Sequence, residues 1–255
     1  MHLLKKTFAS LMCAAIATLM LVAGPVHAGL TVPTRVVFDG SRKEKTIELT
    51  NVGDQPSLVQ AWLDVGDPDA DPATINVPFV ITPALFRVEP DSSQVLRVIN
   101  AALGKPLPKD RETRLFLNLL DVPPKLATDA EQSKLSLAVH YRMPFIYRPA
   151  ALQDVANPHP SVHAATQAQF SLNQSADGWT LRVANNSAYS LSFRSITTGP
   201  SGSEYATAGG EVLPFSESSF PMSESVPGPS AEGWVVRYGV VDDAGYAVPG
   251  EGRLR

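Results

Sequence analysis

The chain has 255 residues, a formal net charge of −4 at pH 7, 22 prolines and a single cysteine, Cys13. Without excess positive charge it lacks the basic surface that phosphate backbones require, so we expect no nucleic-acid partner. The sequence contains no Gly-rich phosphate loop and no G-x-S-x-G motif, and Cys13 lies in the N-terminal segment. We therefore expect neither enzymatic activity nor a cofactor, and no disulfide.

The first 28 residues have the composition of a secretory signal peptide. Lys5 and Lys6 precede an almost uncharged apolar run over residues 7–24, and a small-residue cleavage site ends at Ala28. A membrane anchor would instead be followed by charged stop-transfer residues, and no later segment is apolar enough to span a bilayer. We therefore predict a signal peptide over residues 1–28, export to the periplasm and no membrane insertion.

Strand-like segments recur at intervals of about 8–12 residues through the first half of the mature chain. Polar turns rich in Pro, Asp and Gly separate them. Seven such strands make one immunoglobulin-like sandwich, which we place at residues 29–149. The segments are residues 30–38, 45–50, 58–63, 79–88, 94–99, 113–120 and 134–147.

A second strand series follows residues 150–161, which are rich in Pro, Ala and Asn and show no periodicity. The glycine- and serine-rich residues 197–210 within this series suggest long loops. Together the two series predict an all-β fold of two immunoglobulin-like β-sandwich domains, the second covering residues 150–255. The strand-like segments of the second series are residues 168–172, 179–184, 191–196 and 234–241.

One segment, residues 135–143, alternates apolar and other residues with a period of two. Leu135, Leu137 and Val139 would form an apolar row on one face of a strand. An exposed apolar strand edge promotes aggregation, so such a row at a sheet edge would serve a purpose. The pattern alone leaves open whether these side chains instead face their own core.

Several ordered motifs resemble the periplasmic chaperones of the chaperone–usher pilus pathway, of the P-pilus chaperone type. The resemblance covers nearly the whole mature chain and is most specific in the first domain. There it rests on residues 34–40, 60–62, 82–90, 110–112, 118–119, 123–124 and 147–149. In the second domain it rests on residues 185–189 and 242–245.

The resemblance implies a chaperone that binds pilus or fimbrial subunits by donor-strand complementation and delivers them to an outer-membrane usher. In that family an apolar strand of the first domain is lent to an incomplete subunit. Leu135, Leu137 and Val139 are therefore implied to be the donor residues. The same exposed edge leaves self-association of the free protein open.

The family also uses two cations, an arginine on the first strand and a lysine at the end of the lending strand, to hold the terminal carboxylate of the subunit. Arg35 occupies the arginine position, and its rigid fork of donors suits a carboxylate. Pro144 stands at the lysine position, so the pair is not carried over intact. Either Arg35 acts alone or Arg142 shares its task, unless Arg142 is an ordinary solvated residue.

The resemblance further places Glu112, Arg148 and Asp243 in an ion network between the two domains. Asp242 could take the place of its neighbour, and exposed pairs of this kind would contribute only about 0–1 kcal/mol. If the three charges meet at the domain boundary, we expect them to set the angle between the domains.

Two other classes of protein compete with this interpretation. A secreted β-sandwich adhesin or pilus structural subunit would show an incomplete sandwich or a free donor extension. A periplasmic hydrolase would need a convergent acid–base site, which no motif indicates. His159 and His163 stand four apart, but prolines flank them, so we expect neither a helix presenting both imidazoles nor a metal site.

Overall fold

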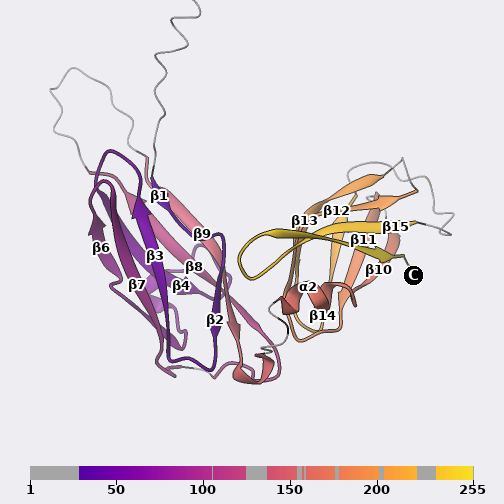
Figure 1. The fold of residues 1–255 in the computed structure, drawn as a ribbon, viewed down its shortest axis with the longest axis horizontal. Coiled ribbons are helices and arrows are strands. Elements are labelled where there is room, and N and C mark those ends of the chain that lie inside the picture. The colour runs from indigo at the N-terminus through magenta and orange to yellow at the C-terminus, as the bar shows by residue number, and fades with distance from the viewer. Residues whose placement is uncertain are drawn as a thin grey trace, which may run out of the picture.

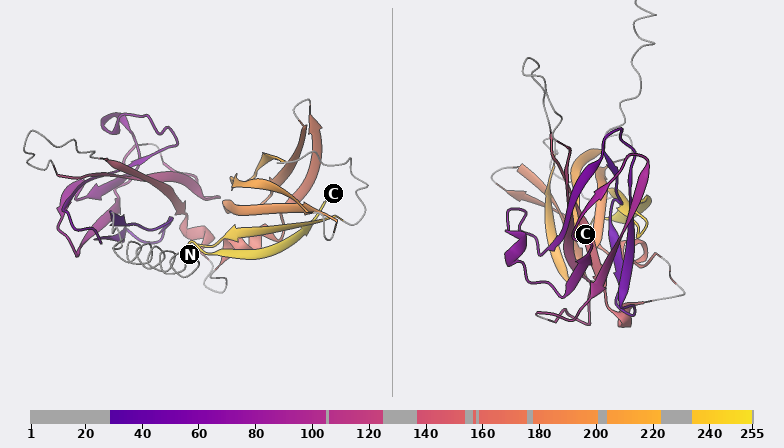
Figure 2. Two further views of the ribbon diagram at one scale, coloured as in Figure 1. Left: turned by 90° about the horizontal axis from the view of Figure 1, so that it is seen from above. Right: turned by 90° about the vertical axis from the view of Figure 1, so that its left-hand side faces the viewer.

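The computed structural model describes residues 29–104, 106–124, 137–153, 157, 159–175, 178–200, 204–222 and 234–254. Its strands gather into two lobes that lie side by side along the long axis of the molecule (Figure 1). The view from above, on the left of Figure 2, shows the same two lobes next to each other. No helix within the described ranges is long and apolar enough to cross a membrane.

The first lobe contains two sheets. An antiparallel four-stranded sheet has the order β1-β3-β7-β5, and a mixed five-stranded sheet has the order β2-β9-β8-β4-β6. The strands of the first sheet are β1 (Leu30–Thr31), β3 (Glu44–Asn51), β7 (Ser92–Asn100) and β5 (Phe79–Thr82). Those of the second are β2 (Val36–Asp39), β9 (Val139–Arg148), β8 (Thr113–Val122), β4 (Ser57–Asp64) and β6 (Leu85–Val88).

Alternating apolar side chains build the core between these sheets. On β4 every second residue from Ser57 to Leu63 is buried, as the period of a strand requires. Three aromatic rings fill the centre: Phe38 lies 5.1 Å from Phe79 and 5.9 Å from Phe145, centroid to centroid. Each ring buries a large apolar surface, so the cluster packs β2 and β9 of one sheet against β5 of the other.

The second lobe is also a sandwich of two sheets, with strand orders β10-β11-β14 and β13-β12-β15-β16. Phe170 stacks on Tyr238 in its core, and Phe193 meets the same tyrosine edge-on. The two lobes therefore confirm the predicted all-β fold of two sandwiches. The strands are β10 (Gln169–Ser175), β11 (Gly178–Asn185), β14 (Ser216–Pro221), β13 (Tyr205–Val212), β12 (Leu191–Gly199), β15 (Val235–Val241) and β16 (Ala247–Arg253).

The predicted loop over residues 197–210 is wrong, because β12 runs to Gly199 and β13 begins at Tyr205. Small residues in β13 indicated a turn, but they make room for neighbouring side chains. A Cβ atom on Gly210 would stand 2.4 Å from the Phe220 ring. Strands β14 and β16 were also not predicted, because serines in β14 and glycines in β16 interrupt the alternation of apolar and polar residues.

Three other segments differ from the predictions. The expected strand over residues 79–88 is divided at Pro83 into β5 and β6, which belong to different sheets. The first expected strand, residues 30–38, is likewise divided between the sheets as β1 and β2. A short helix, α2 (Pro160–Ala165), stands where no helix was predicted. Pro160 occupies its first turn, where a missing N–H group costs nothing.

The remaining elements are two 3₁₀ turns. The turn η1 (Pro72–Thr74) lies between β4 and β5, and η2 (Ala150–Leu152) follows directly on β9. The second turn begins the connection between the lobes. It therefore helps to place the end of β9 next to the second sandwich.

Candidate functional site

Strand β9 has one edge that is only partly covered. Strand β8 pairs with it along residues 139–147. On the other side β2 pairs with it in parallel, and only from Phe145 to Arg148. The described strands leave the backbone of residues 139–144 without a partner on that side. Such an edge offers free N–H and C=O groups to an additional strand.

The apolar row of β9 continues past the core of its own domain. Met143 and Phe145 are buried on the core face, and Tyr141 packs against the same core. Two further steps along the alternation, the exposed fraction is 42% for Val139 and 65% for Leu137. These two side chains therefore extend the apolar face of β9 into solvent. The third predicted donor residue, Leu135, lies outside the described residues.

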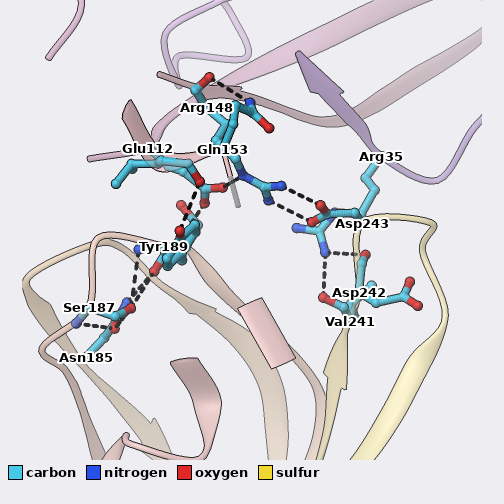
Figure 3. A network of polar contacts seen from close by, with 12 residues as sticks. Arg35, Glu112, Arg148, Gln153, Asn185, Ser187, Tyr189, Val241, Asp242 and Asp243 are labelled. Carbon is cyan, nitrogen blue, oxygen red and sulfur yellow. Dashed lines mark hydrogen bonds and ion pairs between the residues drawn. The ribbon is translucent and has the colours of Figure 1, made fainter. Parts of the chain in front are cut away.

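Arg35 lies at the covered end of this edge, just before β2, and its side chain points to the second lobe (Figure 3). Its Nη1 donates to the carbonyl oxygens of Val241 and Asp242, at 2.8 and 3.0 Å. Its Nη2 donates to Ser192 Oγ at 3.1 Å, while Nε is buried and has no hydrogen-bond partner among the described residues.

The charge of Arg35 survives its burial. Burial lowers the pKa of Arg35, and the negative charge of Asp243, followed by that of Glu211 and Glu112, opposes this shift. An arginine stays protonated in proteins because its ordinary pKa exceeds 12. Arg35 is thus a charged guanidinium with one donor, Nε, that no described residue uses, and charged donors of this kind bind carboxylates.

Arg142, the other predicted anchor residue, holds a carboxylate of its own domain. Its Nε and Nη2 donate to Asp64 at 3.1 and 2.8 Å, and its guanidinium lies 3.5 Å from the centre of the Phe116 ring. Asn118 and the backbone N–H of Gly66 also donate to Asp64. The sharing of a subunit carboxylate by Arg142 stays a prediction, and it would compete with this pairing.

These contacts control the ionisation of Asp64. Burial alone would raise its pKa, but hydrogen bonds from Arg142, Asn118 and Gly66 outweigh burial and hold the pKa below its ordinary value. The neighbouring face of the sheet is aromatic and polar: His140 Nε2 lies 2.9 Å from Asn118 Oδ1, and its ring stacks on Trp62. None of these partners was predicted, because they are distant in the sequence.

Arg148, at the end of β9, joins both lobes (Figure 3). Its Nε donates to Glu112 Oε1 at 2.6 Å, and its two Nη atoms donate to both carboxylate oxygens of Asp243 at 2.6 and 2.8 Å. Burial would lower the pKa of Arg148, but Asp243 and Glu112 raise it above its ordinary value. The three residues therefore meet at the domain boundary, whereas their effect on the domain angle stays a prediction.

The second lobe also binds Glu112 directly. The second carboxylate oxygen of Glu112, Oε2, accepts a hydrogen bond from the backbone N–H of Ser190 at 2.7 Å. The Asn185 side chain donates to Tyr189 O at 2.7 Å and so fixes the preceding turn. Asp242, the alternative partner for the arginine, instead accepts hydrogen bonds from Ala244 and Tyr246 in its own turn.

Sequence reasoning missed two other contacts between the lobes. Arg114 of β8 forms an ion pair with Glu211 of β13, and the Arg111 guanidinium lies 5.0 Å from the centre of the Phe215 ring. Neither pair belongs to a local motif, so only the assembled fold could reveal it. Among the described residues no group of three or more His, Cys, Asp or Glu side chains could hold a metal ion.

Residues 30–153 match the family described as pili and flagellar-assembly chaperone, PapD N-terminal domain, and residues 163–252 match the pili assembly chaperone PapD, C-terminal domain. The chain belongs to the PapD family of pili assembly chaperones. The exact boundary at residue 149 stays a prediction, because these matches leave residues 154–162 unassigned.

Individual relatives agree with the family. The probable fimbrial chaperone YadV of Escherichia coli K12 is 34% identical over 223 residues, 87% of each chain. The chaperone protein FimB/FhaD of Bordetella pertussis is 32% identical over 236 residues, 91% of each chain. The crystal structure of the Pseudomonas aeruginosa CupB2 chaperone superposes with a TM-score of 0.69 at 33% identity, covering 87% of this chain and 98% of that one.

Replacing Arg148 with alanine should strongly destabilise this PapD-family protein. The change leaves two carboxylates facing each other in a buried site, so we expect a loss of about 3–5 kcal/mol in the free energy of unfolding at pH 7. Burial already raises the pKa of Glu112, and removing the cation would raise it further. The loss should therefore shrink as the pH falls towards 5, because protonation of Glu112 removes the repulsion.

Urea unfolding at pH 7 and pH 5 would measure this effect. The matched control is Arg182→Ala, which removes an arginine from an exposed pair with Glu217 in the second lobe. That control should cost no more than about 1 kcal/mol. Equal stability of the two variants at pH 7 would contradict the buried network.

Asp64 should titrate below its usual value near 3.9. Its pairing contributes stability that is present above the ordinary carboxyl pKa and is lost as the pH falls through the lowered pKa of the folded state. Carbon-13 NMR of the side-chain carboxyls would measure this titration. In Arg142→Met we expect the Asp64 titration to move upward, and an unchanged midpoint would show that Arg142 does not control this carboxylate.

Proposed function

We propose that this chaperone binds an incomplete pilus subunit by adding the free edge of β9 to the sheet of the subunit. The observation that carries the proposal is the row formed by Leu137 and Val139, which continues the core face of β9 into solvent beside an unpaired backbone edge. Strand addition uses both parts of this arrangement. Main-chain hydrogen bonds hold the added strand, and the alternating side chains fill pockets of the partner.

The apolar row supplies the binding energy. Each of these side chains contributes roughly 1.5–3 kcal/mol when it is fully buried in a subunit groove. Leu135 would extend the row by one more side chain. Covering the row also prevents aggregation through the free edge, both of the chaperone and of the subunit. An uncovered edge also offers a second copy of the chaperone a place to pair, so any self-association of the free protein would use the same edge.

Arg35 then fixes how far the subunit strand can slide along β9. Its unused Nε and its Nη2 belong to one fork, so a terminal carboxylate could accept two parallel hydrogen bonds there. Its Nη1 would keep the contacts with Val241 and Asp242. Arg142 would strengthen the field at this end of the edge while it remains paired with Asp64.

The proposal also covers the compartment in which the chaperone works and the protein that receives its subunit. The signal peptide over residues 1–28 directs the chain to the periplasm, where the loaded chaperone passes its subunit to an outer-membrane usher. The chaperone binds and releases its subunit and catalyses no reaction. A pilus structural subunit remains the alternative, but its incomplete sandwich differs from the first lobe, whose described strands form sheets of four and five strands.

Leu137→Glu should abolish the subunit complex and leave the chaperone folded. The new charge would be buried in an apolar groove, whereas in the free protein the position is largely exposed. Co-expression with a pilin subunit from the same pilus gene cluster, followed by affinity purification, would measure capture. Leu85→Glu is the matched control, because Leu85 is 63% exposed at the far edge of the same sheet. Unfolding of free Leu137→Glu would place Leu137 in the core instead.

Arg35→Met should abolish subunit capture, and Arg142→Met should weaken it. The first change removes the fork, and the second removes only a neighbouring charge. The same co-expression measures both variants, with melting temperatures of the free proteins as the control for folding. If Arg142→Met captures the subunit as well as the wild type while Arg35→Met fails, Arg142 has no share in the anchor.

A further inference from the structure

Two arginine side chains, Arg114 and Arg142, lie over the ring of Phe116, which is the neighbour of Pro144 in the five-stranded sheet. Phe116 of β8 pairs directly with Pro144, and Arg114 lies two residues away on the same face. The guanidinium of Arg114 lies 4.7 Å from the centre of the Phe116 ring, and that of Arg142 lies 3.5 Å from it. On the other side of β9, Arg35 directly precedes Val36, which pairs with Phe145, and the Arg35 guanidinium reaches the second lobe. The end of the free edge is therefore lined by cations on both sides.

Arg142 and Arg114 differ in what holds them. Asp64 is almost completely buried in the same domain as Arg142 and accepts two hydrogen bonds from it. Arg114 instead pairs with Glu211 of the other domain, and both side chains keep contact with solvent: the exposed fraction is 28% for Arg114 and 15% for Glu211. Arg114 can therefore exchange its carboxylate partner more easily than Arg142 can.

Glu211 also lies next to Arg35. It pairs with Ser192 across β12 and β13, and Ser192 Oγ accepts a hydrogen bond from Arg35. One oxygen of Glu211, Oε1, is buried without a hydrogen-bond partner among the described residues, as is Nε of Arg35. Ser192 thus links Glu211 to Arg35, and the Glu211 carboxylate uses only part of its own hydrogen-bonding capacity.

We propose that Arg114 is the second cation of the subunit anchor and that Glu211 occupies it in the free chaperone as an internal substitute for the terminal carboxylate of the subunit. This inference rests on the proposed function. The two carboxylates are the same chemical group and compete for one guanidinium. Binding of a subunit therefore releases Glu211 from Arg114 and removes one of the contacts between the domains.

The competition has opposite consequences for the two residues. Loss of the Arg114 charge removes one charge-assisted hydrogen bond to the subunit, so capture should fall on the order of tenfold. Neutralising Glu211 frees Arg114 and removes a negative charge near the incoming carboxylate, so capture should rise by a similar factor. A pair that only stabilised the domain interface would give losses in both variants.

A competition for limited subunit tests this difference. Wild-type and variant chaperones carrying different tags are co-expressed with a pilin subunit from the same pilus gene cluster, and mass spectrometry measures the ratio of the two complexes. Arg114→Met and Glu211→Gln are each compared with the wild type. A second form of the pilin carries a Gly-Ser extension, which moves its terminal carboxylate away from the anchor. Both effects should disappear with the extended pilin.

The matched control is the pair Arg182 and Glu217, which also joins an arginine to a glutamate across two strands but lies in the second lobe. Arg182→Met and Glu217→Gln should leave the ratio at one. A ratio of one for Arg114→Met, equal losses with both forms of the pilin, or a loss for Glu211→Gln would each overturn the inference. Capture by the wild type tests the proposed function separately. If Arg114→Met fails to fold, Glu211→Gln still decides the question.

Discussion

The buried guanidinium of Arg148 forms ion pairs with both lobes, and we expect the arrangement of the lobes to depend on this contact. It comes from the last residue of β9, and its partners come from both domains. Burying a charge costs free energy unless the charge is paired and hydrogen-bonded, and we expect few orientations of the lobes to place Glu112 and Asp243 correctly at once. The strand that presents the free edge, β9, therefore also ends in the contact with the second domain.

The exposed apolar edge is a feature that most sheets avoid. In this chain the risk of aggregation is limited to a short segment, because β2 covers the edge of β9 from Phe145 onward and the core of the domain buries Met143 and Phe145. Only the residues towards Leu137 are covered neither by β2 nor by the core. The domain can thus be stable by itself and still present side chains that gain free energy only when a partner buries them.

Local patterns predicted the parts of the fold in which alternation is strong. Strands such as β4 and β8 could be located because large apolar residues recur at alternate buried positions, namely Leu115, Leu117 and Leu119 of β8 and Val59 and Leu63 of β4. Strand β13 could not, since Gly209 leaves room for the backbone of Phe193 and Arg194 and Gly210 for the Phe220 ring, and a local pattern shows neither. The contact of Arg148 with Asp243 was predicted from motifs, whereas the pairing of Arg114 with Glu211 depends on how two distant strands face each other across the lobes.

The parallel pairing of β2 with β9 limits the length of β9 that a partner strand can pair with. A strand that adds to β9 from the open end can advance only until it meets β2 at Val36, which stands beside Phe145. Pro144, just before this stop, has no N–H group to offer. The length of the added strand is thus set by the place where β2 begins, at Val36. A partner whose last strand is one residue too long would present every side chain to the wrong face, so the stop selects partners by length as well as by composition.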